Sequence, residues 1–209
     1  MYNKGNYRLG KDELLQVLES WDANLKKPLF LAACGGTALT LYGHKESTKD
    51  VDFLIPDPRQ YEMTIAMLTA MGYARATGFG YKHPDAPWIF DLFRGQRIFE
   101  TDLLDPVQEP AFHRVIKKFK FVTLACLNPP DLIISQMFRG TSVDVDDSIT
   151  MIQAENLDLQ ALAQRYKETA GYYYFPEKCK TNLQYLIDEL KERRIDATPL
   201  EEMSSQWTP

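Results

Sequence analysis

Three aspartates are the residues whose type and spacing point most directly to chemistry. Asp50 and Asp52 stand two positions apart in DVDFLI, a segment that alternates as a strand does. Side chains two positions apart on a strand project from the same face, roughly 6.5 Å from each other. Asp91 interrupts WIFDLF, an otherwise apolar run that is typical of a central strand. If the two strands are neighbours, three carboxylates converge on one point.

Carboxylates gathered in this way need a positive partner, because like charges held close together in a partly buried site repel each other. Oxygen ligands with few His or Cys residues nearby favour Mg²⁺ or Mn²⁺ over zinc. Such sites typically serve phosphate chemistry, in which the metal holds the attacking and the leaving oxygen. We therefore predict Asp50, Asp52 and Asp91 as the metal ligands and the catalytic residues.

Gly35 and Gly36 lie where an apolar strand, PLFLAAC, meets a short helix that we expect to begin at Thr37. Glycines leave room for a triphosphate, and the amides at a helix start bind anionic oxygens. Gly35, Gly36 and Thr37 are thus the predicted nucleotide-binding residues. Lys45, in the loop HKESTK, is a further candidate phosphate contact, and a solvated loop explains it equally well. A lone glycine pair or a lone D-x-D is weak evidence, so the prediction depends on their combination.

The stretch GGTALTLYGHKESTKDVDFLI resembles the nucleotidyltransferase (polymerase-β-like) superfamily, whose pattern is a glycine pair at a strand–helix turn, a D-x-D strand and a later acidic strand. More narrowly, it is similar to small prokaryotic members related to abortive-infection toxin nucleotidyltransferases. The resemblance covers residues 31–55 and extends to Asp91. It implies transfer of NMP from an NTP to an acceptor hydroxyl, with Mg²⁺ or Mn²⁺ as cofactor and release of pyrophosphate.

The resemblance continues in NPPDLIISQMFRGTSVDVDDSI. In the family, a helix here carries a lysine that contacts the nucleotide, followed by two closing acids. Asp144 and Asp147 match the acids, Gln136 stands where the lysine is expected, and Arg139 is the available substitute one turn later. The missing lysine favours an alternative function, a catalytically silent protein of this fold that binds a nucleotide or a partner and regulates it. In a third interpretation the aspartates are structural and bind no metal.

The elements that must position these residues lie within residues 1–127. Their order predicts an α/β (α+β) fold, in which helices flank a nucleotidyltransferase-like mixed sheet. Hydrophobic spacing and turn residues place them along the chain. Residues 105–120 show no clear pattern. We expect helices at 11–21, 37–43 and from Pro58 after an Asp57 N-cap, and strands at 28–34, 50–55, 88–93, 97–104 and 120–127.

We predict that residues 128–209 form a helical C-terminal region that packs on that core. A helix follows the prolines at 129 and 130, and the stretches 151–170 and 179–194 carry leucines at helical spacing. Residues after about 197 are expected to form a tail, either disordered or docked through Trp207. In GYYYFPEK the aromatic side chains either pack on the core or a partner, which we favour, or stack on bases.

The composition is that of a globular protein, with 44% hydrophobic and 25% charged residues among 209 and a net charge of −5. A mildly acidic chain is not a bulk polyanion binder. Three widely separated cysteines form neither a disulfide framework nor a zinc knuckle. The N-terminus has no apolar signal core and the chain has no 18-residue apolar run, so we predict a cytoplasmic protein with no membrane contact.

The acceptor is left open by the sequence. An RNA such as tRNA, a protein hydroxyl and a small molecule such as an aminoglycoside are the three classes that we consider. The toxin-like resemblance favours RNA or protein as acceptor and implies an antitoxin or another protein as partner.

Overall fold

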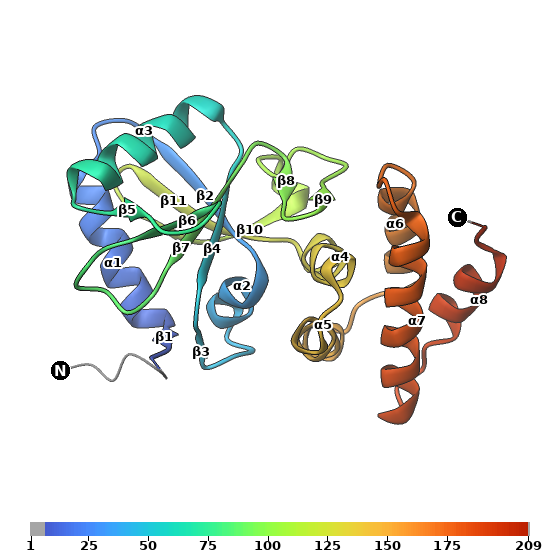
Figure 1. Cartoon of the computed structure of the whole chain (residues 1–209). Coiled ribbons are helices and arrows are strands. Elements are labelled where there is room, and N and C mark those ends of the chain that lie inside the picture. The colour runs from blue at the N-terminus through green and yellow to red at the C-terminus, as the bar shows by residue number, and fades with distance from the viewer. Residues whose placement is uncertain (1–6, 209) are drawn as a thin grey trace. The chain divides into compact units, whose positions relative to one another are not determined.

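The computed structural model describes residues 7–208, which form two compact units (Figure 1). The first unit comprises residues 7–97 and 105–128, and the second comprises residues 98–104 and 129–208. The start of the N-terminal segment in which we found no signal sequence lies outside the described residues. No helix within residues 7–208 is both long enough and apolar enough to cross a membrane.

A mixed sheet of seven strands forms the centre of the first unit, in the order β10-β11-β2-β4-β7-β6-β5. The pairs β11–β2 and β4–β7 are parallel, and the other neighbours are antiparallel. This mixed sheet with its flanking helices confirms the α/β class that the sequence predicts. Its strands are β2 (Leu29–Ala33), β4 (Val51–Ile55), β5 (Ala74–Arg75), β6 (Gly80–Lys82), β7 (Phe90–Arg94), β10 (His113–Lys118) and β11 (Val122–Leu127).

Helix α1 (Lys11–Asn24) covers one face of this sheet (Figure 1). Its apolar stripe ends in the fully buried Trp21, whose ring contacts the rings of Phe53 on β4 and Phe90 on β7. Because side chains alternate along a strand, Asp52 and Asp91 project from the opposite face. The core thus fixes the two strands on one side and leaves the carboxylates on the other.

Two further helices join the strands of the first unit. Helix α3 (Pro58–Ala70) begins as expected, with the Asp57 side chain accepting a hydrogen bond from the Arg59 amide. Helix α2 (Gly35–Tyr42) begins two residues earlier than predicted, so both glycines belong to its first turn. A small separate sheet pairs β1 (Leu9–Gly10) with β3 (Ser47–Thr48).

Several short strands differ from the prediction. Residues 97–104 do not join the large sheet but form a hairpin of β8 (Arg97–Ile98) and β9 (Thr101–Asp102), and β9 packs against helix α4 of the second unit. Within the unassigned segment 105–120, a 3₁₀ turn at Pro110–Phe112 leads into β10. Strands β5 and β6 have two and three residues, too few for a periodic pattern.

Residues 129–208 of the second unit are helical, in agreement with the fold class that the sequence predicts. Tyr166 and Phe138, both buried, contact each other at its centre, and the N-cap Asp158 separates α5 from α6 within the predicted stretch 151–170. The expected tail is a helix, and Trp207 after it is buried against Tyr166. The helices are α4 (Pro129–Arg139), α5 (Ser142–Ala154), α6 (Leu159–Ala170), α7 (Pro176–Glu192) and α8 (Thr198–Gln206).

Candidate functional site

Asp52 and Asp91 lie directly beside each other in the sheet. Strands β4 and β7 are parallel neighbours, and their register pairs Asp52 with Asp91. Neighbouring strands are about 4.8 Å apart, so the two carboxylates start from backbone positions only that far from each other. Asp52 is 8% exposed, whereas Asp91 is partly exposed. The structure therefore brings these two predicted site residues together on one face.

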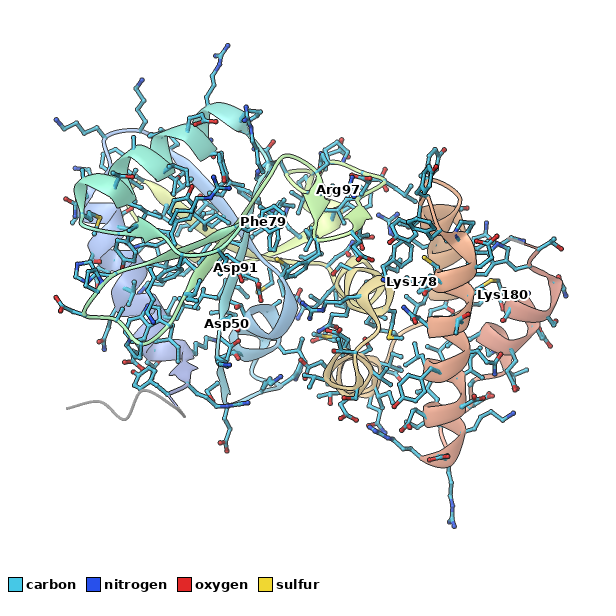
Figure 2. The ribbon with its side chains drawn as sticks, in the orientation of Figure 1. Asp50, Phe79, Asp91, Arg97, Lys178 and Lys180 are labelled. Atoms are coloured by element: carbon cyan, nitrogen blue, oxygen red, sulfur yellow. The ribbon has the colours of Figure 1, made fainter. Side chains whose placement is uncertain are left out.

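Asp50 precedes β4 by one residue and lies in the bend after β3. Its carbonyl oxygen accepts hydrogen bonds from the hydroxyls of Thr48, at 2.7 Å, and Thr37, at 3.2 Å, which hold the bend in place. Its negative charge reaches Asp91: burial, and then the charge of Asp50, raise the pKa of Asp91, while hydrogen bonding from the Thr77 hydroxyl acts in the opposite direction. Figure 2 shows Asp50 and Asp91 in the same part of the unit. Asp91 is thus coupled electrostatically to Asp50 and paired in register with Asp52.

The donor set of this cluster fits a hard divalent cation, since all its ligands are carboxylate oxygens. Within residues 7–208, no three His, Cys, Asp or Glu side chains are already arranged as a metal-ligating group. Three carboxylates repel one another, and a cation between them is what would draw their oxygens together. The backbone pairing of Asp52 and Asp91 places two of the three carboxylates side by side.

Gly35 is fitted to Asp52. Its φ of +54° lies in the left-handed region, and a Cβ atom on it would lie 2.7 Å from Oδ2 of Asp52. Any other residue would push the carboxylate away. The amide of Cys34 donates a 3.1 Å hydrogen bond to the carbonyl oxygen of Asp52, which fastens the start of α2 to β4. The N-terminus of α2, where amides lack acceptors within the helix, therefore lies against the buried carboxylate.

Thr37 holds the D-x-D segment through its side chain. The hydroxyl accepts a 2.9 Å hydrogen bond from the Asp52 amide and donates to the carbonyl oxygen of Asp50, and the residue is fully buried. Because the hydroxyl of Thr37 is already hydrogen-bonded, its backbone amide is the group that could bind an anion. Lys45 lies after Gly43, at the other end of α2, about 12 Å from the glycine pair along a helix of this length. Its contact with a phosphate stays a prediction.

A loop that the sequence analysis did not single out completes this face. Gly80 on β6 pairs with Asp91, and a Cβ on Gly80 would lie 2.9 Å from Oδ1 of Asp91 and 2.3 Å from Oγ1 of Thr77. The Gly80 amide donates a 2.9 Å hydrogen bond to that hydroxyl. Asp91 thus has a glycine against it, as Asp52 has. The signal in the sequence is TGFG, two glycines around an aromatic residue just before a strand.

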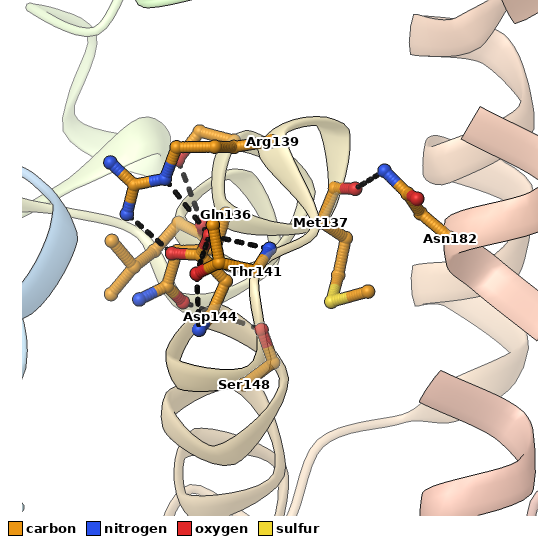
Figure 3. Close-up of polar contacts among 9 residues, drawn as sticks. Gln136, Met137, Arg139, Thr141, Asp144, Ser148 and Asn182 are labelled. Carbon is orange, nitrogen blue, oxygen red and sulfur yellow. Dashed lines mark hydrogen bonds and ion pairs between the residues drawn. The ribbon is translucent and has the colours of Figure 1, made fainter. Parts of the chain in front are cut away.

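The second unit shows what surrounds the position of the family lysine (Figure 3). Gln136 is 2% exposed; its Oε1 accepts a 3.4 Å hydrogen bond from Ser148, and its Nε2 has no hydrogen-bond partner within residues 7–208. The candidate substitute Arg139 donates two hydrogen bonds to Asp144, one of 2.9 Å from Nε, and lies 4.7 Å above the ring of Phe99. Neither side chain presents an available cation.

Asp144, one of the two closing acids, is a structural residue of α5. Together with Thr141 it forms the capping box of that helix, with a 3.0 Å hydrogen bond from the Thr141 amide (Figure 3). Burial raises the pKa of Asp144, but the hydrogen bonds from Arg139 and Thr141 more than offset this, so its pKa lies below the ordinary value. Asp147 follows three residues later on the same helix.

Comparison with known proteins shows which family and which solved structures resemble this chain. A family model described as nucleotidyltransferase of unknown function (DUF6036) matches residues 12–194. An antigenic nucleotidyltransferase-like protein from Paracoccidioides brasiliensis has a similar structure, with a TM-score of 0.51 and 16% identity over 93% of this chain and 95% of that one. The structure of ANT(2″)-Ia in complex with adenylyl-2″-tobramycin also gives a TM-score of 0.51, with 11% identity over 76% and 95% of the two chains.

At these identities the likeness to solved structures concerns the fold alone, which is nucleotidyltransferase-like. None of the curated proteins matches the sequence. The family model, in contrast, spans most of the chain, including Gly35, Asp52 and Asp91. The chain therefore belongs to the family of nucleotidyltransferases of unknown function known as DUF6036.

Proposed function

We propose that this protein is a metal-dependent nucleotidyltransferase that transfers NMP from an NTP to an acceptor hydroxyl and releases pyrophosphate. The observation that carries the proposal is the pairing of Asp52 with Asp91 on neighbouring strands, beside the Gly35 end of α2. A carboxylate pair next to an anion-binding helix start suits a metal-bound triphosphate. Membership of the nucleotidyltransferase family supports the same chemistry.

Each residue of the site has a role in this proposal. Asp50, Asp52 and Asp91 would hold Mg²⁺ or Mn²⁺, which when bound neutralises phosphate charge and orients the attacking and leaving oxygens. The amides of Gly35, Gly36 and Thr37 would bind the triphosphate at the start of α2. Asp91, paired with Asp52 across the strands, would complete the metal site and help to activate the acceptor hydroxyl.

The experiment that tests this function compares Asp52→Asn with Asp57→Asn. Purified proteins are incubated with Mg²⁺, each α-labelled NTP and a panel of total RNA, cellular protein and aminoglycosides, and label transfer is counted. Asp52→Asn removes a metal-binding charge and should lower transfer by about 10³-fold or more. Asp57 is an N-cap outside the site, where Asn caps equally well, so Asp57→Asn should keep full activity.

Thermal unfolding of both variants separates loss of chemistry from loss of fold, since each should melt close to the wild type. Wild-type transfer that persists in Asp52→Asn would remove the metal assignment and the proposed function with it.

A silent regulator is the second candidate, and the environment of Gln136 favours it. The segment that aligns with the family lysine offers a buried amide and an arginine already paired with Asp144. A silent protein would bind Mg²⁺–NTP without turnover. A ligand at about 100 times its Kd adds about 2.7 kcal/mol to stability, so a rise in Tm without label transfer would select this function.

The narrower resemblance of residues 31–55 extends the first proposal to a toxin-like role in the cytoplasm, with RNA or a protein as acceptor and an antitoxin as partner. Induced expression tests it, because growth should stop with the wild type and continue with Asp52→Asn. Equal growth in both cultures would argue against toxicity.

A further inference from the structure

The order of strands gives the candidate site two sides. Across the sheet, β2 leads into the glycine turn, β4 carries Asp52, β7 carries Asp91 and β6 begins with Gly80. The amides that would bind the triphosphate thus lie on the β2 side of the carboxylates. In an in-line displacement the acceptor approaches the α-phosphorus from the side opposite the leaving pyrophosphate. That side is the one formed by β7, β6 and the loop Thr77–Gly80.

Phe79 is the exposed aromatic residue of that loop. Its side chain is 49% exposed, its ring centroid lies 5.1 Å from that of Phe93, and its carbonyl oxygen accepts a 3.0 Å hydrogen bond from the Leu92 amide. Phe93 follows Asp91 by two positions on β7, so the Phe79 ring lies on the same face as the carboxylate. In the view of Figure 2, Asp91 lies between Asp50 and Phe79.

The loop is held firmly enough to act as part of a site. Besides the hydrogen bond that the Phe79 carbonyl oxygen accepts from the Leu92 amide, the Arg75 guanidinium donates to the carbonyl oxygen of Gly78, and the Gly80 amide donates to the Thr77 hydroxyl. An exposed ring is thereby fixed on the face of Asp91, and the positive charge of Arg75, at the end of β5, is bound to the same loop. Aromatic rings with a nearby cation are the contacts by which proteins bind single-stranded nucleic acid, through base stacking and phosphate attraction.

We propose that the loop Thr77–Gly80 is the acceptor wall of the site, and that Phe79 stacks on a base at the end of an RNA strand whose terminal hydroxyl is the acceptor. This inference rests on the proposed nucleotidyltransferase function. The oxygen of that hydroxyl attacks the α-phosphorus, the bond to pyrophosphate breaks, and the hydroxyl proton is released to solvent. A polycationic aminoglycoside fits the Arg75 charge poorly, and a serine side chain brings no ring to Phe79.

Binding separates this inference from the chemistry. We would measure fluorescence anisotropy of a 5′-labelled RNA 12-mer, and of the same RNA lacking its 3′-terminal base, with wild type, Phe79→Ala, Phe79→Trp and Asp52→Asn. Loss of one stacked base weakens binding about 5- to 150-fold. Phe79→Ala should show that loss with the intact RNA and none with the abasic RNA, and Phe79→Trp should bind as the wild type does.

Asp52→Asn should keep the binding of RNA, so failure of transfer in that variant leaves the acceptor proposal standing. Tyr185→Ala is the matched control, because Tyr185 is 41% exposed, close to the exposure of Phe79, but lies on α7 of the second unit. Equal affinity of wild type and Phe79→Ala for the intact RNA would overturn the proposal. An increase in the KM for NTP alone in Phe79→Ala would also overturn it, since the ring would then contact the donor base. Labelling of protein or aminoglycoside in place of RNA would do the same.

Discussion

The two units of this protein treat their buried carboxylates in opposite ways. In the helical unit, Asp131 accepts two hydrogen bonds from Arg165, one of them 2.9 Å long, and Asp144 is paired with Arg139. In the α/β unit, Asp52 stands beside Asp91, whose pKa rises under burial and the charge of Asp50. The helical unit pairs its buried carboxylates with arginine, whereas the α/β unit places carboxylates next to one another.

We use this difference to distinguish structural carboxylates from the proposed site carboxylates. A buried carboxylate with an arginine serves the fold, because removing the partner leaves an uncompensated charge. A carboxylate whose pKa is raised by burial and by a neighbouring carboxylate lowers the stability of the fold and is typical of catalytic and metal sites. Asp144, which matches one of the two closing acids, therefore falls into the first class, and the second class is the one that we propose for the strand acids.

The largest effect on stability is expected from breaking a helical pair. Arg165→Met keeps much of the side-chain volume but leaves Asp131, whose side chain is 4% exposed, without its cation. It should lower the free energy of unfolding by about 3–5 kcal/mol in urea denaturation. The double variant Asp131→Leu, Arg165→Met should recover most of that loss, and a single variant within 1 kcal/mol of wild type would contradict the structural assignment.

The second largest effect on stability is expected at Gly35, the glycine that lies against Asp52. Gly35 and Gly43 stand at the two ends of α2, both with positive φ, and a Cβ on Gly43 would meet nothing within 4 Å. Gly43→Ala should therefore cost only the backbone strain, about 1–2 kcal/mol. Gly35→Ala adds the contact with the carboxylate, which raises the loss by about 1–3 kcal/mol and should abolish transfer. Equal losses of stability and activity in the two variants would show that the carboxylate needs no such space.

A smaller effect is expected from pH through Asp144. Its folded-state pKa lies below the ordinary value, so its stabilisation is complete above about pH 4 and is lost as pH falls through the folded-state pKa. Asp144→Asn should be about 1–2 kcal/mol less stable than wild type at pH 7, and the difference should narrow below pH 4. Urea unfolding at several pH values measures this, and a difference independent of pH would be evidence against the Arg139 pair as its source.

The smallest effect has the opposite sign. Asp91→Asn relieves repulsion between neighbouring carboxylates, and like charges at paired strand positions typically cost roughly 0.2–1 kcal/mol. In EDTA the variant should be more stable than wild type by that order, while its transfer activity with Mg²⁺ is lost. A decrease in stability would place Asp91 with the structural carboxylates, and the contrast between the two units would then disappear.

The sequence predicts the site where local pattern determines geometry. Alternation in DVDFLI identifies β4, and the apolar run around Asp91 identifies β7 as a central strand, so their meeting follows once the two are neighbours. The fold class and the Asp57 N-cap follow from patterns of the same local kind. Backbone geometry limits the prediction at α2, because the left-handed φ of Gly35 lets the helix begin inside the glycine pair.

Contacts between distant segments explain what the sequence does not predict. The TGFG loop lies at the candidate site because Gly80 pairs with Asp91 across neighbouring strands. Strand β6, which makes this pair, has three residues. Residues 98–104 have a strand-like composition, yet their partners are each other and α4. The commitment of Arg139 to Asp144 depends on the turn between α4 and α5. None of these has a periodic signal.

The path of the chain between the units has a consequence for its synthesis. Residues 98–104 leave the ribosome before β10 and β11, and well before α4, on which β9 packs. A nascent chain that has just completed β11 therefore carries Ile98 and Leu103, both buried in the final structure, without the helices that cover them. Because each unit is encoded in two separate pieces, a single cut in the gene at the end of β11 yields one fragment with surplus apolar surface and another that lacks part of its own core.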